Sequence, residues 1–305
     1  MRAIPISTLN SLAAAPDSFM QAGERRYAEQ LSAAAERIYE EREQRPVVLI
    51  SGPSGSGKTT SASRIQALLR AKGCETHTIS MDDYFLPQSA NEAARDENGN
   101  IDYESPLRLD IPLFREHLEK LANCETIDIP SFDFAAQERR EGMPLKRNEG
   151  DLVILEGIHA LNPLVTGDSD SYTNCVYVSV RTRISDSDGA LLHPAKIRLM
   201  RRLMRDKLYR GRALRETFEF FKSVERGENL YIMPFKSRAN FDIDTFIEYE
   251  ASVYRDILLP ELDAAEEECR DFYEDFSDIR RFLTMLDGVD RSFVPENSLI
   301  REFIG

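Results

Sequence analysis

The chain has 305 residues, of which 42% are hydrophobic and 30% are charged, a composition typical of a globular protein with one large α/β domain or two smaller ones. Its formal net charge of −14 argues against nucleic acid or an anionic membrane as partner, because both need clustered positive charge. No apolar run approaches the ~20 residues of a membrane span, and the start has no secretion signal, so we expect a cytoplasmic protein.

The first predicted element is a long helix. Residues 17–44 are rich in Ala, Glu and Arg, and Tyr27, Leu31, Ala34 and Ile38 recur at helical spacing. We therefore expect residues 1–45 to form a leader helix. Its apolar face should pack on the domain that follows or on a second subunit, which leaves a homo-oligomer open.

From Pro46 onward, strand-like and helix-like segments alternate. The predicted strands are residues 47–51, 76–80, 126–130, 152–156 and 175–180, and the predicted helices between them are 58–69 and 112–123. Such alternation predicts an α/β domain with a mainly parallel sheet flanked by helices, in which strand 76–80 lies beside strand 47–51.

The second half of the chain is predicted to be mainly helical. Beyond Pro194 the only expected strand lies near residues 241–245. We assign residues 46–305 to one domain, with a helical lid at about 193–230 and a helical extension at about 246–305. The polar stretch 87–102 is expected to be a loop over a site.

The four cysteines are far apart in sequence and include no CxxC pair. This spacing favours neither a zinc site nor a disulfide framework, so we expect reduced, buried thiols. The cysteines are Cys74, Cys124, Cys175 and Cys269.

The stretch GPSGSGKTT, residues 52–60, follows the first strand and opens a helix. It satisfies G-x-x-x-x-G-K-[ST], the phosphate-binding P-loop, and so predicts a P-loop NTPase fold that binds a nucleoside triphosphate with Mg²⁺. Lys58 should reach the β- and γ-phosphates, and Thr59 should bind the metal through its hydroxyl. The expected nucleotide-binding residues of this stretch are Gly52, Ser54, Gly55, Ser56, Gly57, Lys58, Thr59 and Thr60.

Other signals narrow the class of P-loop protein. The chain has no N-K-x-D element for guanine, and strand 152–156 ends in the single acid Glu156 where motor ATPases have a D-E pair. Glu156 is predicted to serve as a Mg²⁺ ligand, the alternative being an ordinary surface acid.

Two adjacent acids, Asp82 and Asp83, follow strand 76–80 at the edge of the sheet where α/β folds bind ligands. One of them is expected to point inward, where a carboxylate could take the proton of an attacking hydroxyl or hold Mg²⁺. The alternative is a pair of solvated acids that cap a loop.

An arginine-rich helix is predicted over residues 196–212. Arg198, Arg201, Arg202 and Arg205 share about a third of its circumference, and apolar residues occupy the opposite side. In so acidic a chain these guanidiniums, together with Arg210 and Arg212, are expected to bind phosphates, although a solvated basic face is the alternative. Gly211 would let the lid hinge.

Taken in order, the segments GPSGSGKTT, ISMDDYF, NIDYESPLRLDIPLFREHLEKL, IPSFDF, LVILEGIHALN and RLMRRLMRDKLYRGR resemble the uridine kinase and phosphoribulokinase family. The similarity spans residues 46–212. The segments ENLYIMPFKSRANFDIDTFIEYE and FVPENSLIREFIG resemble a bacterial uridine kinase-like nucleoside kinase subgroup. There the kinase often follows a threonyl-tRNA-synthetase-like module, for which residues 1–45 are too short.

The resemblance implies a role for particular residues. Asp82 matches the base for a ribose 5′-hydroxyl, Phe85 an aromatic that touches the nucleoside, and Asp102 an acid that holds the ribose hydroxyls. Arg202 and Arg205 match lid arginines that contact substrate and phosphates, and Arg210 and Arg212 match a pair near the ATP phosphates.

Two positions depart from the family pattern. Phe132 stands where uridine-cytidine kinases have a tyrosine, and Gln137 where they have a base-reading histidine. Because hydrogen bonds from this pocket decide which base is accepted, the departures leave the nucleoside open. His159 and His193 could read a base instead, but a structural or solvated role is favoured for both.

The resulting hypothesis is a nucleoside kinase that uses ATP and Mg²⁺ to phosphorylate the 5′-hydroxyl of uridine or cytidine. Lys58, Asp82 and Arg205 would be catalytic, and Thr59, Glu156 and Asp82 would hold the metal. The alternatives are a kinase of another small alcohol, such as a sugar phosphate or an organic acid, and a nucleotide-binding regulatory protein without transfer activity.

Overall fold

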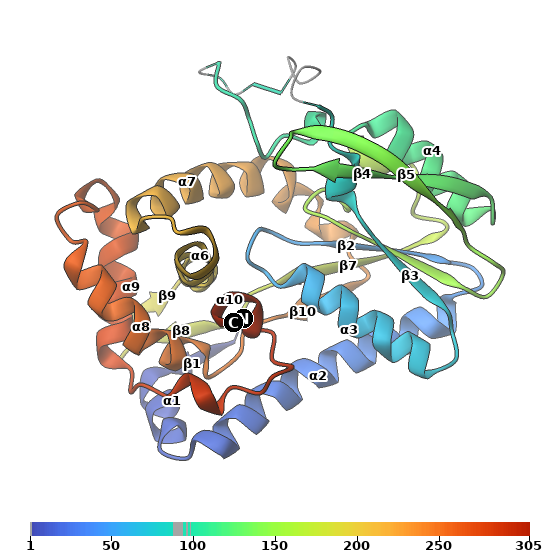
Figure 1. Ribbon diagram of the computed structural model, residues 1–305. Helices are drawn as coiled ribbons and strands as arrows, with labels where there is room; N and C mark the ends of the chain where they lie inside the picture. Colours follow the sequence, from blue (N-terminus) through green and yellow to red (C-terminus); the bar gives the residue numbers. More distant parts are fainter. Residues whose placement is uncertain (1, 88–93, 96, 98) are drawn as a thin grey trace.

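The computed structural model describes residues 2–87, 94, 95, 97 and 99–305 (Figure 1). Its α-helices are α1 (Ile6–Ala13), α2 (Pro16–Glu41), α3 (Lys58–Ala71), α4 (Ile111–Ala122), α5 (Pro163–Thr166), α6 (Pro194–Arg210), α7 (Leu214–Tyr231), α8 (Glu250–Ala264), α9 (Tyr273–Met285) and α10 (Arg301–Ile304). Its strands are β1 (Ala3–Pro5), β2 (Val47–Ser51), β3 (Thr76–Ser80), β4 (Thr126–Asp133), β5 (Glu138–Lys146), β6 (Leu152–Glu156), β7 (Thr173–Ser179), β8 (Arg183–Ser185), β9 (Leu191–Leu192) and β10 (Phe241–Asp244). The short 3₁₀ helices include η1 (Met81–Tyr84), η3 (Pro106–Arg108), η4 (Met233–Arg238), η5 (Arg270–Phe272) and η6 (Arg291–Phe293).

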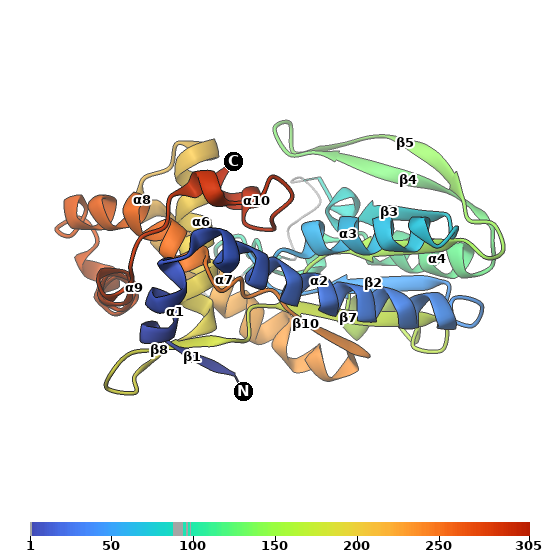
Figure 2. The same cartoon turned by 90° about the horizontal axis from the view of Figure 1, so that it is seen from below.

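The central sheet is parallel and has the strand order β10-β7-β2-β6-β3. Every residue of β2, β6 and β7 is buried, as expected for apolar strands covered on both faces. Val48 and Ile50 point into the core under α2 and α3, whereas Val47 and Leu49 point into the core under α4 (Figures 1 and 2). The predicted α/β architecture is confirmed.

The predicted neighbour of the P-loop strand is wrong. β6, not β3, pairs directly with β2, and β3 lies at the edge of the sheet beyond β6. The burial of the two strands explains this order: β6 is buried along its whole length, whereas only Thr76 and Ile79 are buried in β3. A half-exposed strand suits an edge, and a wholly apolar one suits the interior.

The leader contains the predicted long helix as α2, preceded by two shorter elements. β1 pairs in parallel with β8, and α1 continues directly from it. Tyr27, Leu31 and Ile38 are buried in the same core as the central sheet, and the Tyr27 hydroxyl shares a 2.7 Å hydrogen bond with Ser61 Oγ on α3. The apolar face of the leader therefore packs against the P-loop helix.

Residues 126–130 form a strand, but not in the parallel sheet. They belong to β4, which pairs antiparallel with β5 in a two-stranded hairpin that projects beyond the central sheet (Figure 2). No residue of β5 is buried, because its sequence ERREGMPLK has too few apolar side chains to be covered on both faces. Of the predicted loop at 87–102, residues 88–93, 96 and 98 lie outside the described part of the chain.

The helices α6 to α9 gather at the end of the molecule beyond the carboxyl ends of the sheet strands (Figure 1). Among the helices that the structure describes, none combines the length and the apolar character needed to cross a membrane. The four cysteines are unpaired, and three are buried as expected, whereas Cys124 is partly exposed.

Candidate active site

The P-loop connects β2 to α3 and depends on two glycines. A Cβ on Gly52 would lie 1.9 Å from the carbonyl oxygen of Val178, so no side chain fits there. Gly57 has a φ of +81°, and a Cβ on it would lie 2.7 Å from Leu299 Cδ1. Both positions therefore require glycine, and the turn that they allow places the start of α3 at the phosphate site.

The carbonyl groups of the loop are held by side chains outside it. Arg198 donates to the Ser54 carbonyl at 3.2 Å, Arg201 to the Gly55 carbonyl at 3.1 Å, and Thr245 Oγ1 to the Ser56 carbonyl at 2.7 Å. Carbonyls fixed in this way leave the loop's N–H groups free to face an anion. The helix α6 thus helps to shape the P-loop.

Two buried polar groups, one in the P-loop and one on α6, are suited to bind a phosphate. Ser56 Oγ is buried and has no hydrogen-bond partner, and the same holds for Nε of Arg202. Nη1 of Arg202 donates to Ser54 Oγ at 2.7 Å, which holds this guanidinium at the loop. Lys58 Nζ rests on the Pro53 carbonyl at 3.2 Å. A phosphate would supply the acceptors that these groups lack.

The predicted phosphate-binding role is wrong for Arg201. Its side chain is completely buried and forms two hydrogen bonds to the Glu250 carboxylate, at 2.7 and 3.0 Å, and one to the Thr245 carbonyl. The helix is buried on nearly every side, so the amphipathic pattern does not leave an exposed basic face. Arg201 binds protein acceptors, not a ligand.

The predicted metal ligands Thr59 and Glu156 lie next to each other at the end of the sheet. In the sheet register Glu156 lies between Ile50 on β2 and Ser80 on β3, and its Oε1 accepts a 3.2 Å hydrogen bond from Thr59 Oγ1. Among the described residues no three His, Cys, Asp or Glu side chains converge as an all-protein metal cage. Hydroxyl and carboxylate oxygens completed by nucleotide phosphates are the donor set that suits Mg²⁺.

The two adjacent acids diverge as predicted. Asp83 accepts a 3.4 Å hydrogen bond from the backbone N–H of Phe132 and so faces the β4–β5 hairpin. Asp82 is exposed to solvent on one side, and its pKa is raised to about 6, first by desolvation from the surrounding protein and next by the charge of Glu156, although Lys58 opposes the rise. Asp82 is thus the acid of the pair that lies within electrostatic range of Lys58 and Glu156.

Glu104 is a site residue that the sequence reasoning missed. Burial raises its pKa to about 7, while Arg202 and then Lys58 act to lower it, and Asp102 and Asp82 add to the rise. Its signal in the sequence was an acid two residues after Asp102 in the segment DYESP. Glu104 therefore lies within electrostatic range of four other charged groups, Arg202, Lys58, Asp102 and Asp82.

The Asp102 carboxylate is buried, and both of its oxygens are paired with side chains of the protein. Arg226 pairs with Oδ1 at 2.7 Å, and the Tyr231 hydroxyl donates to Oδ2 at 2.8 Å, both from α7. His159 packs against Tyr231 and hydrogen-bonds the Glu104 backbone, and burial lowers its pKa to about 4, so its ring is neutral. This network ties the loop that carries Asp102 to α7.

Aromatic rings gather beside Asp82. Phe85, Phe132 and Phe134 form a triad with ring centroids 5.1 to 5.9 Å apart, and the Arg108 guanidinium lies 4.9 Å from the centre of the Phe85 ring. Phe134 and Arg108 were not predicted from the sequence. Gln137 lies in the β4–β5 turn with a φ of +55°, and its amide donates to the Phe134 carbonyl at 2.7 Å. The side chain of Gln137 thus closes the turn that carries Phe134.

The remaining arginines predicted to bind phosphate surround one buried acid. Asp206 is paired with Arg205 at 3.4 Å, Arg210 at 3.2 Å and Arg212 at 3.5 Å. One carboxylate cannot neutralise three guanidiniums, so the cluster keeps a positive charge. His193, the other histidine considered above, caps α6 by accepting the Ala195 N–H at 3.2 Å.

Residues 294–305 also reach the P-loop, which the sequence did not predict. Leu299 packs against Gly57, and the Thr60 hydroxyl donates to Glu302 at 2.6 Å. The helix α10 lies between α3 and α6 in Figure 1 and contacts α6.

Comparison with known proteins identifies the family. The model of the phosphoribulokinase/uridine kinase family matches residues 47–250. Uridine kinases of Staphylococcus aureus strains JH9 and Newman are 30% identical over 217 residues, which cover 70% of this chain and 87% of theirs. A crystal structure described as a fructose transport system kinase, from Silicibacter sp. TM1040, superposes with a TM-score of 0.50 at 20% identity over 70% of this chain and 97% of that chain, which shows the P-loop kinase fold. The chain therefore belongs to the phosphoribulokinase/uridine kinase family, whose members are phosphotransferases that act on hydroxyl groups.

Proposed function

We propose that this protein is a nucleoside kinase that transfers the γ-phosphate of ATP, with Mg²⁺, to the 5′-hydroxyl of uridine or cytidine. The observation that carries the proposal is the strand register that sets Glu156 between the P-loop strand and β3, the strand that directly precedes Asp82. Phosphate loop, metal ligand and base then occupy three adjacent strand ends. The aromatic triad beside Asp82 suits a flat base, and the S. aureus relatives bear the name uridine kinase.

The residues present fit the nucleotide and its metal. Thr59 and Glu156, with Asp82 nearby, would hold Mg²⁺, which supplies charge stabilisation to the phosphates. The P-loop N–H groups, the unpaired Ser56 hydroxyl and Arg202 would hold the phosphate oxygens.

In the reaction, the acceptor oxygen forms a bond to the γ-phosphorus while the bond from that phosphorus to the β–γ bridging oxygen breaks. Asp82 takes the proton of the attacking hydroxyl. Lys58 and Arg205 stabilise the charge that develops on the transferred group, and Arg210 and Arg212 bind near the ATP phosphates once a phosphate competes with Asp206 for them. Asp102 would hold the ribose hydroxyls, with Phe85 and Phe132 beside the base and Gln137 at the hairpin turn.

A substrate panel tests the acceptor. ADP release from ATP and Mg²⁺ is measured with ribonucleosides, deoxyribonucleosides, ribulose 5-phosphate, pantothenate and glycerate, and each product is identified by mass. Selective formation of uridine or cytidine monophosphate is the expected result. Turnover confined to another alcohol would favour the second candidate, which the engagement of Gln137 in its own turn supports. Tight ATP binding without transfer to any alcohol would favour a regulatory protein.

Asp82→Asn tests the base. The variant should bind ATP as the unmodified protein does and lose about 10²-fold or more in kcat, since general base catalysis contributes about 10²–10⁴-fold. Asp83→Asn is the matched control, because Asp83 bonds the hairpin backbone, and it should keep most of the turnover. Near-normal turnover of Asp82→Asn would remove Asp82 from the mechanism.

A further inference from the structure

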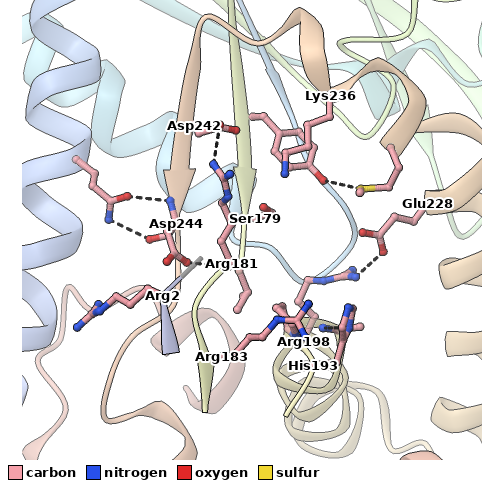
Figure 3. A pocket seen from close by; sticks show the side chains of 16 residues that line it. Arg2, Ser179, Arg181, Arg183, His193, Arg198, Glu228, Lys236, Asp242 and Asp244 are labelled. Carbon is pink, nitrogen blue, oxygen red and sulfur yellow. Dashed lines mark hydrogen bonds and ion pairs between the residues drawn. The ribbon is translucent and has the colours of Figure 1, made fainter. Parts of the chain in front are cut away.

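A cavity of about 700 Å³ lies beside the carboxyl ends of β7 and β10, bounded by η4, α7 and the start of α6 (Figure 3). It is large enough for a small metabolite. Neither the P-loop nor Asp82, Glu156 or the aromatic triad lines it. The proposed kinase reaction therefore leaves this cavity without a role.

The cavity is rich in cations although the chain as a whole is acidic. Five of its lining residues are arginine or lysine and three are acidic, and each of these acids already has a cationic partner. Asp242 pairs with Arg181 at 2.6 Å, Glu228 pairs with Arg198, and Asp244 pairs with Arg26 at 3.3 Å. The carboxylates of the cavity are thus neutralised by neighbouring arginines.

Two cations remain without an acidic partner. Arg183, on β8, and Lys236, on η4, form no ion pair with any residue that the structure describes. Nε of Arg183 is also buried without a hydrogen-bond acceptor. Burial, followed by the charge of Arg181, lowers the pKa of Lys236, and the charges of Asp242 and Glu228 oppose this shift only in part. The cavity therefore holds uncompensated positive charge.

His193 adds a neutral donor. Its Nδ1 accepts the Ala195 N–H at 3.2 Å, and burial together with Arg183 and Arg198 lowers its pKa, so the neutral ring carries its proton on Nε2. Figure 3 shows Arg183, Arg198 and His193 together at one end of the cavity and Lys236 across from them.

We propose that this cavity is a second binding site, separate from the P-loop, for a small phosphorylated metabolite. Arginine forks, an ammonium and an imidazole N–H are the donors that phosphate oxygens accept from, and the two unpaired cations would gain the acceptors that they lack. The volume exceeds what a single inorganic phosphate needs, which favours a phosphate ester or a diphosphate.

The site is connected to the P-loop through one side chain. Arg198 lines the cavity, pairs with Glu228, and donates to the Ser54 carbonyl in the P-loop. An anion that binds Arg198 competes with Glu228 for it, and so reaches the element that holds ATP. Occupancy of the cavity would thereby change the affinity for ATP, and by linkage ATP would change the affinity for the ligand.

Calorimetry with inorganic pyrophosphate tests the site. The full chain is first saturated with a non-hydrolysable ATP analogue and Mg²⁺, so that the P-loop is filled, and the titration is repeated with the Lys58→Ala variant. We expect one pyrophosphate per chain in both. The double variant Arg183→Gln/Lys236→Gln should bind at least tenfold more weakly, whereas the charge-conserving Arg183→Lys/Lys236→Arg should bind within about threefold of the unmodified protein.

Arg70→Gln is the matched control, because Arg70 is exposed at the far end of α3, and it should leave binding unchanged. Circular dichroism and thermal unfolding show that each variant is folded. No binding to the unmodified protein, or equal binding by the double glutamine variant, would overturn the proposal. The readout requires no phosphoryl transfer, so its failure is distinct from failure of the proposed kinase function.

Discussion

Asp82 combines exposure to solvent with a raised pKa, whereas an exposed aspartate ordinarily has a pKa of about 4. It is exposed to solvent, yet desolvation by the surrounding protein and the charge of Glu156 raise its pKa to about 6. A base with such a pKa is mostly ionised near neutrality and binds a proton more readily than a carboxylate of ordinary pKa. The environment thus makes Asp82 a better proton acceptor without disabling it at pH 7.

A pH profile checks this point. With a pKa raised to about 6, the Asp82 carboxylate becomes protonated as the pH falls through about 6. We therefore expect kcat/KM for ATP, measured at subsaturating nucleoside, to decrease when the pH is lowered past about 6, whereas an ordinary carboxylate would delay this decrease to about pH 4. Glu104, with a pKa of about 7, is the other acid that could cause this fall. In Glu104→Gln the acid limb should stay near 6. A limb near 4, or one that disappears in Glu104→Gln, would contradict the assignment to Asp82.

At the scale of elements, the arginines of helix α6 fall into two groups. Its later arginines form a cationic cluster around Asp206, and its earlier arginines hold the P-loop carbonyls. Helical periodicity correctly places the arginines on one side, but it cannot show that this side is covered by Glu250 and Thr245, which lie more than forty residues away. An arginine stripe is therefore predictable, whereas its division into structural and ligand-binding members is not.

The variant Arg201→Met tests the structural role of Arg201. The variant leaves the Glu250 carboxylate buried and unpaired, so the free energy of unfolding should drop by about 3–5 kcal/mol in guanidinium chloride titrations. Adding Glu250→Leu should recover much of this loss, because the uncompensated charge is removed. Lys207→Met on the same helix breaks only a partly exposed pair and should cost about 1 kcal/mol or less. Equal losses in Arg201→Met and Lys207→Met would contradict this role of Arg201.

At the scale of the whole molecule, local patterns predict the elements better than their partners. Strands such as β2 and β6 are short apolar runs between turn residues, so they are readable from the sequence. The order of the strands in the sheet depends on pairing between segments that are far apart in the sequence. Only the polar residues of THTIS indicate that β3 is an edge strand. The hairpin strand β5 was missed because its polar sequence has no strand-like periodicity. The P-loop, Glu156 and Asp82 could be predicted as site residues because each lies at or just after the end of a readable strand.

The same limit applies to residues 294–305, since no local pattern places them against a loop some 240 residues earlier. Leu299 is completely buried against Gly57, and Leu299→Ala should therefore lower the free energy of unfolding by about 2–5 kcal/mol and weaken ATP binding, because the start of α3 loses its support. Denaturant titration and calorimetry with an ATP analogue measure the two effects. Leu230→Ala, at an exposed position of α7, should change both very little. If Leu299→Ala reduces stability but leaves ATP affinity intact, the segment stabilises the fold without shaping the nucleotide site.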